Sequence, residues 1–224
     1  MKYNTCIIWL LALMLVAPLV VSCSDDDDNG KVNEYLNWES RNNHYFDSIR
    51  VLALKEINLA KKQYGDSWEE HCEWRAFRSF SLDQSSTTNT AKDSIFVKIL
   101  NTGTGSGSPL STDSVRVFYA GFLIPTVSYP EGMIFDHSGQ SSFLENIFDH
   151  ETSMPSSFLV TSSVRGFATA LQYMHIGDKW RVYIPANLAY KNIGQDRVPA
   201  YSTINFIVEL VQYARAGNKL PAWN

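Results

Sequence analysis

Histidines and closely spaced glycines are the residues whose types most directly suggest chemistry. The chain has five histidines, namely His44, His71, His137, His150 and His175. They lack the short mutual spacing of zinc ligands, so we expect no metal site. Gly103, Gly105 and Gly107 alternate as in a phosphate loop, but no lysine stands where a nucleotide loop needs one, and a turn between strands is expected instead. The chain also has no Gly-x-Ser-x-Gly elbow, so we predict no cofactor and no serine nucleophile.

Any site in this chain has to be positioned by strands and one helix in its second half. Alternation of apolar and polar residues predicts strands at 95–100, 115–120, 180–184 and 204–210. Apolar residues at helical spacing predict one amphipathic helix that contains Val164, Phe167, Ala168 and Leu171. We therefore predict an α+β fold for residues 93–214, an antiparallel β-sheet wrapped around one α-helix. Residues 81–92 are predicted to be a polar linker and residues 215–224 a C-terminal tail.

Length and composition exclude several classes of protein. The 224 residues are 45% hydrophobic, 13% aromatic and 19% charged, which is the composition of a globular protein rather than of a disordered or collagen-like chain. The formal net charge of -4 leaves no basic surface to neutralise phosphates. We therefore expect no nucleic acid partner.

Residues 1–22 have the pattern of an export signal. Lys2 precedes an apolar run that Pro18 interrupts and that is shorter than the roughly 20 residues of a membrane-spanning helix. The segment Val20–Cys23 resembles a bacterial lipobox, which implies that Cys23 is lipidated and becomes the first residue of the mature chain. The alternative is a conventional secretory signal with a coincidental cysteine. Acyl chains on Cys23 would anchor the protein to a membrane that it does not cross.

Residues 23–30 are predicted to form an acidic tether. Asp25–Asp28 are four consecutive carboxylates, which repel one another and remain solvated. The run is similar to the acidic export signals of surface-exposed lipoproteins from Bacteroidetes-type bacteria. We therefore predict an exported lipoprotein of the outer membrane that faces either the periplasm or the outside. Cys72 is expected to be a buried small apolar residue rather than a nucleophile.

Residues 31–80 are predicted to be a helical N-terminal extension. Helix formers fill residues 31–64, and apolar side chains recur at helical spacing at Phe46, Ile49, Leu52 or Ala53, Ile57 and Ala60. Gly65 is expected to end this helix, and a capping box of Ser67 and Glu70 predicts a second, short helix. The extension would either mediate a homodimer or pack on its own domain.

Six segments of the second half, taken in order, resemble the FKBP-type peptidyl-prolyl cis-trans isomerase domain. They are Val117–Leu123, Gly132–Ser138, Val164–Leu171, Met174–Trp180, Ile184–Tyr190 and Val198–Phe206. The resemblance covers the chain from about Ser94 to Val211. It implies that a proline-containing peptide binds in an aromatic pocket between the helix and the sheet.

The resemblance also implies which residues make this pocket. They are Tyr119, Phe135, Asp136, Val164, Phe167, Tyr190, Val198 and Phe206. Phe167 would lie beneath the proline ring, and the hydroxyl of Tyr190 would hydrogen-bond the substrate carbonyl. Asp136 would accept a hydrogen bond that organises the pocket wall, so Asp136 and Tyr190 are the predicted catalytic residues. Aromatic walls suit an apolar ring that lacks an N–H, although core packing is the alternative for each aromatic residue.

The chain departs from the family pattern at two aromatic positions and in two loops. Phe167 replaces the usual tryptophan, and Ser156 replaces an aromatic residue two positions ahead of Phe158. Residues 125–131 and 138–157 are enlarged segments that would fall near the pocket mouth. There they would either recognise a particular client or obstruct the pocket.

From these features we predict a membrane-anchored peptidyl-prolyl cis-trans isomerase or folding helper for exported proteins. Its partners would be proline-containing peptides or unfolded exported proteins. Such a catalyst is useful because proline isomerisation takes tens to hundreds of seconds without one. The alternative is a non-catalytic FKBP-like lipoprotein that binds peptides or serves as a scaffold, because a fold does not determine an activity.

Overall fold

The computed structural model describes residues 33–82, 90–139 and 148–223. The predicted signal peptide, the lipidation site Cys23 and the acidic tether lie outside these residues. The described chain contains the helices α2 (Trp38–Tyr64) and α3 (Arg165–Leu171), and neither combines the length and the apolar composition needed to cross a bilayer. Its strands are β1 (Trp74–Arg78), β2 (Ser94–Asn101), β3 (Ser114–Phe122), β4 (Ile134–His137), β5 (Ser156–Leu159), β6 (Lys179–Ile184) and β7 (Ile204–Ala214).

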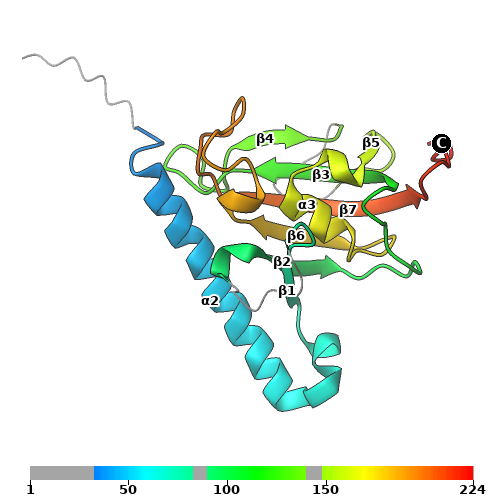
Figure 1. The fold of residues 1–224 in the computed structure, drawn as a ribbon, viewed down its shortest axis with the longest axis horizontal. Coiled ribbons are helices and arrows are strands. Elements are labelled where there is room, and N and C mark those ends of the chain that lie inside the picture. The colour runs from blue at the N-terminus through cyan, green and yellow to red at the C-terminus, as the bar shows by residue number, and fades with distance from the viewer. Residues whose placement is uncertain (1–32, 83–89, 140–147, 224) are drawn as a thin grey trace, which may run out of the picture. The chain divides into compact units, whose positions relative to one another are not determined.

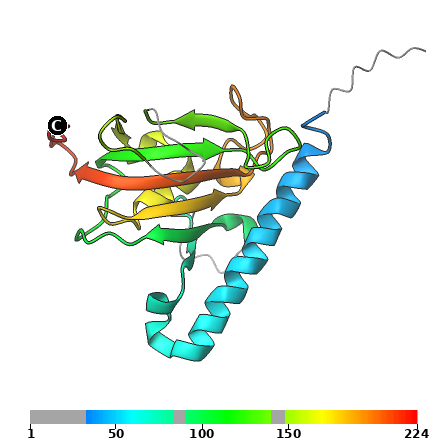
Figure 2. The ribbon, with the colours of Figure 1, turned by 180° about the vertical axis from the view of Figure 1, so that it is seen from behind.

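The strands form one antiparallel sheet. Its order is β1-β2-β6-β7-β3-β4, and β5 also pairs with β3. Helix α3 lies in front of the sheet in Figure 1, and the strands lie in front of α3 when the molecule is seen from behind in Figure 2. The predicted α+β fold is therefore confirmed, with β2, β3, β6 and β7 at the four predicted strands.

Side chains on the strands supply two separate buried layers. On β2, Ile95 and Val97 belong to the core beneath α3, whereas Phe96 between them packs with α2. On β3, Val117 belongs to the α3 core and Phe118 to a cluster on the opposite face. This division follows from the strand itself, because successive side chains point to opposite faces of a sheet.

Helix α3 approaches the sheet closely because its second residue is a glycine. A Cβ at Gly166 would lie 2.4 Å from Cγ2 of Ile184, so a larger residue there would push the helix away from β6. Ala170 and Leu171 are fully buried, and Phe167 is 3% exposed. The close contact of helix and sheet thereby fixes the place of Phe167.

Helix α2 packs on the same domain through polar and apolar contacts. The buried Asn42 donates from Nδ2 to the carbonyl of Trp38 at 2.7 Å and accepts the N–H of Thr203 on Oδ1 at 2.7 Å. Further along, the rings of Phe46 and Phe96 lie 5.6 Å apart. Of the two arrangements predicted for the extension, packing on its own domain is therefore present.

The buried stripe of α2 is close to the predicted one. Phe46, Ile57 and Ala60 are buried, as is Ala53, the alternative that the sequence left open with Leu52. Leu52 is 44% exposed, because it points away from the sheet. Cys72, beyond the helix, packs against the same cluster as a free thiol, but it is half-buried rather than buried as predicted.

Residues 74–78 correct the prediction that the whole of 31–80 is helical. They form β1, which pairs with β2 from Trp74 opposite Lys98 to Arg78 opposite Ser94. Trp74 packs in the α2 cluster and Phe77 against the α3 core. Two residues three positions apart share one face of a helix but lie on opposite faces of a strand. The aromatic residues of this segment therefore pack on both faces of a strand, and each face is covered by one of the two clusters.

The predicted second, short helix is present as a 3-10 helix, but it begins before Ser67 and lacks the predicted cap. A 3-10 helix, Gly65–His71, follows α2 directly. The hydroxyl of Ser67 donates to the carbonyl of Tyr64 at 3.0 Å and caps no N–H, so the expected capping box with Glu70 is not formed. Gly65 does end α2, with φ at 57°, a conformation that glycine adopts without steric cost.

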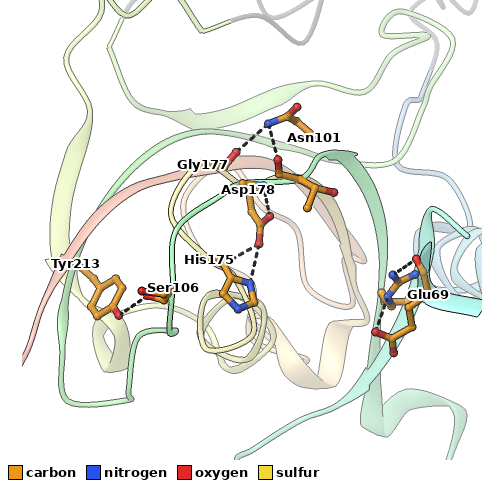
Figure 3. Close-up of polar contacts among 10 residues, drawn as sticks. Glu69, Asn101, Ser106, His175, Gly177, Asp178 and Tyr213 are labelled. Carbon is orange, nitrogen blue, oxygen red and sulfur yellow. Dashed lines mark hydrogen bonds and ion pairs between the residues drawn. The ribbon is translucent and has the colours of Figure 1, made fainter. Parts of the chain in front are cut away.

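The glycine-rich loop after β2 closes against the turn that follows α3 (Figure 3). The buried carboxylate of Asp178 accepts the N–H groups of Gly103 and His175, each at 2.7 Å. A Cβ at Gly103 would lie 2.2 Å from the carbonyl oxygen of Ile176, so only glycine permits this approach. The predicted connection between strands is confirmed, and Gly103 allows its backbone to lie directly against the backbone of the turn after α3.

Phe148 and His150 of the 138–157 insertion lie on the face of the sheet opposite α3. The ring of Phe148 stacks on Phe118 with centroids 5.7 Å apart, and the ring of His150 stacks on it at 4.7 Å. Trp223 of the C-terminal tail meets the same ring edge-on at 5.8 Å. These residues therefore pack away from the helix side of the sheet.

Candidate active site

A cavity of about 260 Å³ lies where α3 meets the strands β3, β4, β5 and β7. Its lining residues are Tyr119, Asp136, Phe158, Ser162, Ser163, Val164, Phe167, Tyr190, Gln195 and Phe206. The volume is near the lower end of the range for small-molecule sites, which begins at about 300 Å³. The cavity is thus of a size for one ring rather than for a large cofactor.

Aromatic rings form the apolar part of the cavity. The ring of Phe167 lies 4.5 Å from that of Phe206 and 6.3 Å from that of Phe158. Tyr119 meets Phe167 at 6.1 Å and Phe158 at 6.4 Å, both in T-shaped contacts. Rings held by one another in this way present a rigid surface, which loses little conformational entropy when a ligand binds.

A hydrogen bond between Tyr119 and Asp136 forms part of the wall. The hydroxyl of Tyr119 donates to Oδ2 of Asp136 at 2.9 Å. Burial, and then the charge of Asp136, raise the pKa of Tyr119 well above its ordinary value, so the phenol keeps its proton. Ser156 also hydrogen-bonds the Tyr119 hydroxyl. The serine that replaces an aromatic residue of the family pattern therefore adds a polar contact to the wall.

Tyr190 brings a second phenol from the loop before β7. The loop is closed by the N–H of Lys191, which donates to the carbonyl of Ala186 at 2.8 Å, and by the N–H of Tyr201, which donates to the carbonyl of Lys191 at 2.7 Å. Burial and the charge of Asp136 raise the pKa of Tyr190. Its hydroxyl, protonated at neutral pH, has no hydrogen-bond partner among the described residues and is available to a bound molecule.

Six of the eight predicted pocket residues line this cavity, and Phe135 and Val198 do not. The ring of Phe135 packs edge-on against Phe206 at 5.6 Å and lines an adjoining hollow together with Asp136. Val198 is 4% exposed and lies within the hydrophobic core. The register of β4 with β3 shifts between Ile134 and Asp136, so regular alternation is interrupted there: Asp136 lines the cavity while Phe135 packs beside it against the core.

The remaining lining residues were not predicted from the sequence. They are Phe158, Ser162, Ser163 and Gln195. Phe158 lies in β5, and an aromatic residue in a strand is a sequence feature that could have indicated the pocket. The two serines and the glutamine belong to short polar segments, in which no sequence pattern indicates a site. No described residue of the segments 125–131 and 138–157 lines the cavity, so these parts of the insertions do not obstruct it. The described side chains also contain no cluster suited to a metal ion.

Comparisons with known proteins point to one family. Residues 105–211 match the family model of the FKBP-type peptidyl-prolyl cis-trans isomerase. A macrophage infectivity potentiator of Trypanosoma cruzi is 33% identical over 116 residues, 51% of this chain and 50% of that protein. The FKBP-type 22 kDa peptidyl-prolyl cis-trans isomerase of Escherichia coli (strain K12) is 33% identical over 125 residues, 55% of this chain and 52% of that protein. This chain thus spans about half the length of these relatives.

A solved structure gives a weaker likeness. The peptidyl-prolyl cis-trans isomerase of Pseudomonas syringae pv. tomato str. DC3000 matches with a TM-score of 0.45 and 24% sequence identity, over 75% of this chain and 96% of that chain. The family model, by contrast, matches the segment that contains α3, β3 to β6, most of β7 and every residue that lines the cavity. The C-terminal half of the chain is therefore an FKBP-type peptidyl-prolyl cis-trans isomerase domain.

Proposed function

We propose that this chain catalyses the cis-trans isomerisation of peptide bonds before proline in exported proteins, and so assists their folding. The observation that carries the proposal is the cavity itself. A floor of packed phenylalanine rings is joined at one wall by two protonated phenols and a carboxylate. This combination suits an apolar ring attached to a polar amide.

The reaction requires rotation about a bond with partial double-bond character. Its barrier is about 18–20 kcal/mol because amide resonance has to be broken. The twisted amide has less charge separation than the planar one, so a site with little water favours it relative to the planar amide. In this cavity Phe167, with 3% of its surface exposed, would supply the dry floor beneath the proline ring.

The polar residues would hold the substrate in place for the rotation. The Tyr190 hydroxyl would donate a hydrogen bond to the substrate carbonyl. Asp136, which accepts the Tyr119 hydroxyl at 2.9 Å, would keep the wall in one arrangement and place its charge near Tyr190. No covalent bond would form, so the rotation requires no lining residue to act as a nucleophile.

NMR exchange spectroscopy on a short X-Pro peptide tests the activity. We expect the wild-type protein to accelerate the exchange and Tyr190→Phe to lower the catalysed rate about fivefold, since one hydrogen bond contributes about 1 kcal/mol. Asp136→Ala should lower it similarly. The wild-type rate should stay constant between about pH 7 and 9, because the raised pKa of Tyr190 keeps the hydroxyl protonated.

Tyr201→Phe is the matched control. This tyrosine is 41% exposed and does not line the cavity, so its loss should leave the rate unchanged. If the wild type gives no acceleration, the catalytic proposal fails. Peptide binding without acceleration would then favour the non-catalytic peptide-binding lipoprotein, and the loss of both would leave a scaffold.

We further propose that Cys23 carries lipid that anchors the chain to the outer membrane, and that residues 31–80 mediate a homodimer. Exposed apolar side chains on α2 support the second point, with Val51 58%, Leu52 44% and Leu59 51% exposed. Labelled palmitate should be incorporated into the wild-type chain and not into Cys23→Ala. Residues 24–224, made without lipid, should sediment as a dimer. Absence of label from the wild-type chain would contradict the lipid anchor on Cys23. A monomer at all protein concentrations would contradict the homodimer.

A further inference from the structure

We propose that the proline cavity is one end of a longer substrate groove, whose other end is an apolar subsite for a side chain of the same polypeptide. This inference rests on the proposed function and concerns its substrate class. It assigns a role to a hollow of about 850 Å³ that is separate from the proline cavity. The ligand would be an extended, unfolded chain with a large apolar residue near its proline.

The three hollows are neighbours that share lining residues. Asp136 lines both the proline cavity and a small adjoining hollow. Ile134 and Arg197 line both that hollow and the large one. A chain that leaves the proline cavity past Asp136 would therefore meet the small hollow first and the large hollow next.

Strand β4 forms the floor of this path. Ile134 and Asp136 stand two residues apart on it, on either side of a shift in its register with β3, and strand residues rise about 3.3 Å each. In the described part of the chain β4 pairs with β3 alone, at one edge of the sheet. An edge strand offers free backbone groups to an extended peptide. Such a peptide would reach the large hollow with a residue about two to four positions from the proline.

The large hollow is mostly apolar. Its apolar lining residues include Tyr35, Tyr129, Pro130, Met133, Ile134 and Pro199. Charged groups lie at exposed positions, from Glu131, Asp196 and Arg197. This lining suits an aromatic or branched apolar side chain, and the mixed charges at the rim give no reason for a strongly charged ligand. A side chain of this kind is buried in folded proteins, so the subsite would select unfolded segments.

Contacts between the N-terminal extension and the enlarged 125–131 loop hold the large hollow open. The carboxylate of Glu34 accepts the N–H of Ser128 at 3.2 Å and also its hydroxyl. Arg41 donates to the carbonyl of Glu34 at 2.7 Å and to that of Pro125 at 3.3 Å. The loop is thereby tied beside the proline cavity rather than over it. The enlarged loop and the extension would therefore both contribute to recognition of the client protein.

Peptide affinity, measured separately from catalysis, tests the groove. Fluorescence anisotropy would compare a short Ala-Leu-Pro-Ala peptide with a peptide of about twelve residues that has one central proline and phenylalanines two to four positions away on both sides. We expect the wild-type protein to bind the long peptide about tenfold more tightly. Tyr129→Ser and Tyr35→Ser should remove most of this difference and leave the affinity for the short peptide unchanged.

Val127→Ser is the matched control, because Val127 belongs to the same loop as Tyr129, is 73% exposed and does not line the hollow. It should keep the tenfold preference. Equal affinity of the wild type for the two peptides, or an unchanged preference in both tyrosine variants, would overturn the groove. A protein that prefers the long peptide but accelerates no X-Pro exchange would overturn the proposed catalysis alone.

Discussion

Replacing Phe167 with alanine is expected to abolish most of the isomerase activity and to destabilise the domain. The ring is 3% exposed and lies 4.5 Å from Phe206, so its removal leaves a hole in the core and takes away the floor of the cavity. We expect a loss of about 3–5 kcal/mol in the free energy of unfolding. At temperatures where the variant is still folded, the catalysed exchange rate should fall about a hundredfold, which is roughly 2.7 kcal/mol.

Phe148→Ala separates these two effects. Phe148 is also a buried phenylalanine, 7% exposed, but it packs on Phe118 on the opposite face of the sheet. This control should lose stability in urea unfolding and keep the exchange rate of the folded protein. Phe167→Trp, unlike Phe167→Ala, should keep the activity, because the larger ring also covers the floor of the cavity. Equal losses of rate in Phe148→Ala and Phe167→Ala would show that the effect of Phe167 is only structural.

Replacing Asp178 with alanine should cost about 3 kcal/mol of stability without touching the cavity. Its carboxylate is buried and accepts the N–H groups of Gly103 and His175, each at 2.7 Å (Figure 3). Alanine takes the acceptor away from two partly buried N–H groups, and each unsatisfied buried group costs about 1–3 kcal/mol. Urea unfolding followed by tryptophan fluorescence measures the change.

Asp178→Asn is the informative companion variant. The amide oxygen of asparagine still accepts one of the two N–H groups, so we expect about half of the loss seen with alanine. The folded Asp178→Ala protein should retain its catalysed rate, since Asp178 does not line the cavity. A loss below about 0.5 kcal/mol for alanine, which is the range of ordinary surface changes, would contradict the role given to this carboxylate.

The site and the proposed groove divide the work between two parts of the chain. The residues that would lie beneath a bound proline belong to the FKBP-type domain, whereas Glu34, Tyr35 and Arg41 belong to the N-terminal extension. Clients would then be distinguished by residues outside the cavity in which the proposed rotation takes place. Substitutions in the N-terminal extension could then change which clients are bound without altering the floor of the cavity at Phe167.

The sequence alone determined the elements with a clear period. Residues 204–210 alternate along a strand, and Val164 to Leu171 repeat with a helical period, because the pattern of burial follows directly from backbone geometry. The order of six short motifs was enough to indicate the FKBP-type domain. It was also enough to name Tyr119, Asp136, Val164, Phe167, Tyr190 and Phe206, which do line one cavity.

Only the tertiary structure decided the pairing of short segments and the surroundings of the site. Trp74–Arg78 is a strand because β2 offers it an edge and two covered faces, a circumstance that local sequence does not encode. Val198 lies in the core and Ser156 against the Tyr119 hydroxyl for the same reason: contacts between residues far apart in the chain depend on how loops close. Loop polar residues have no period, so their positions follow from packing and hydrogen bonds that exist only in the folded chain.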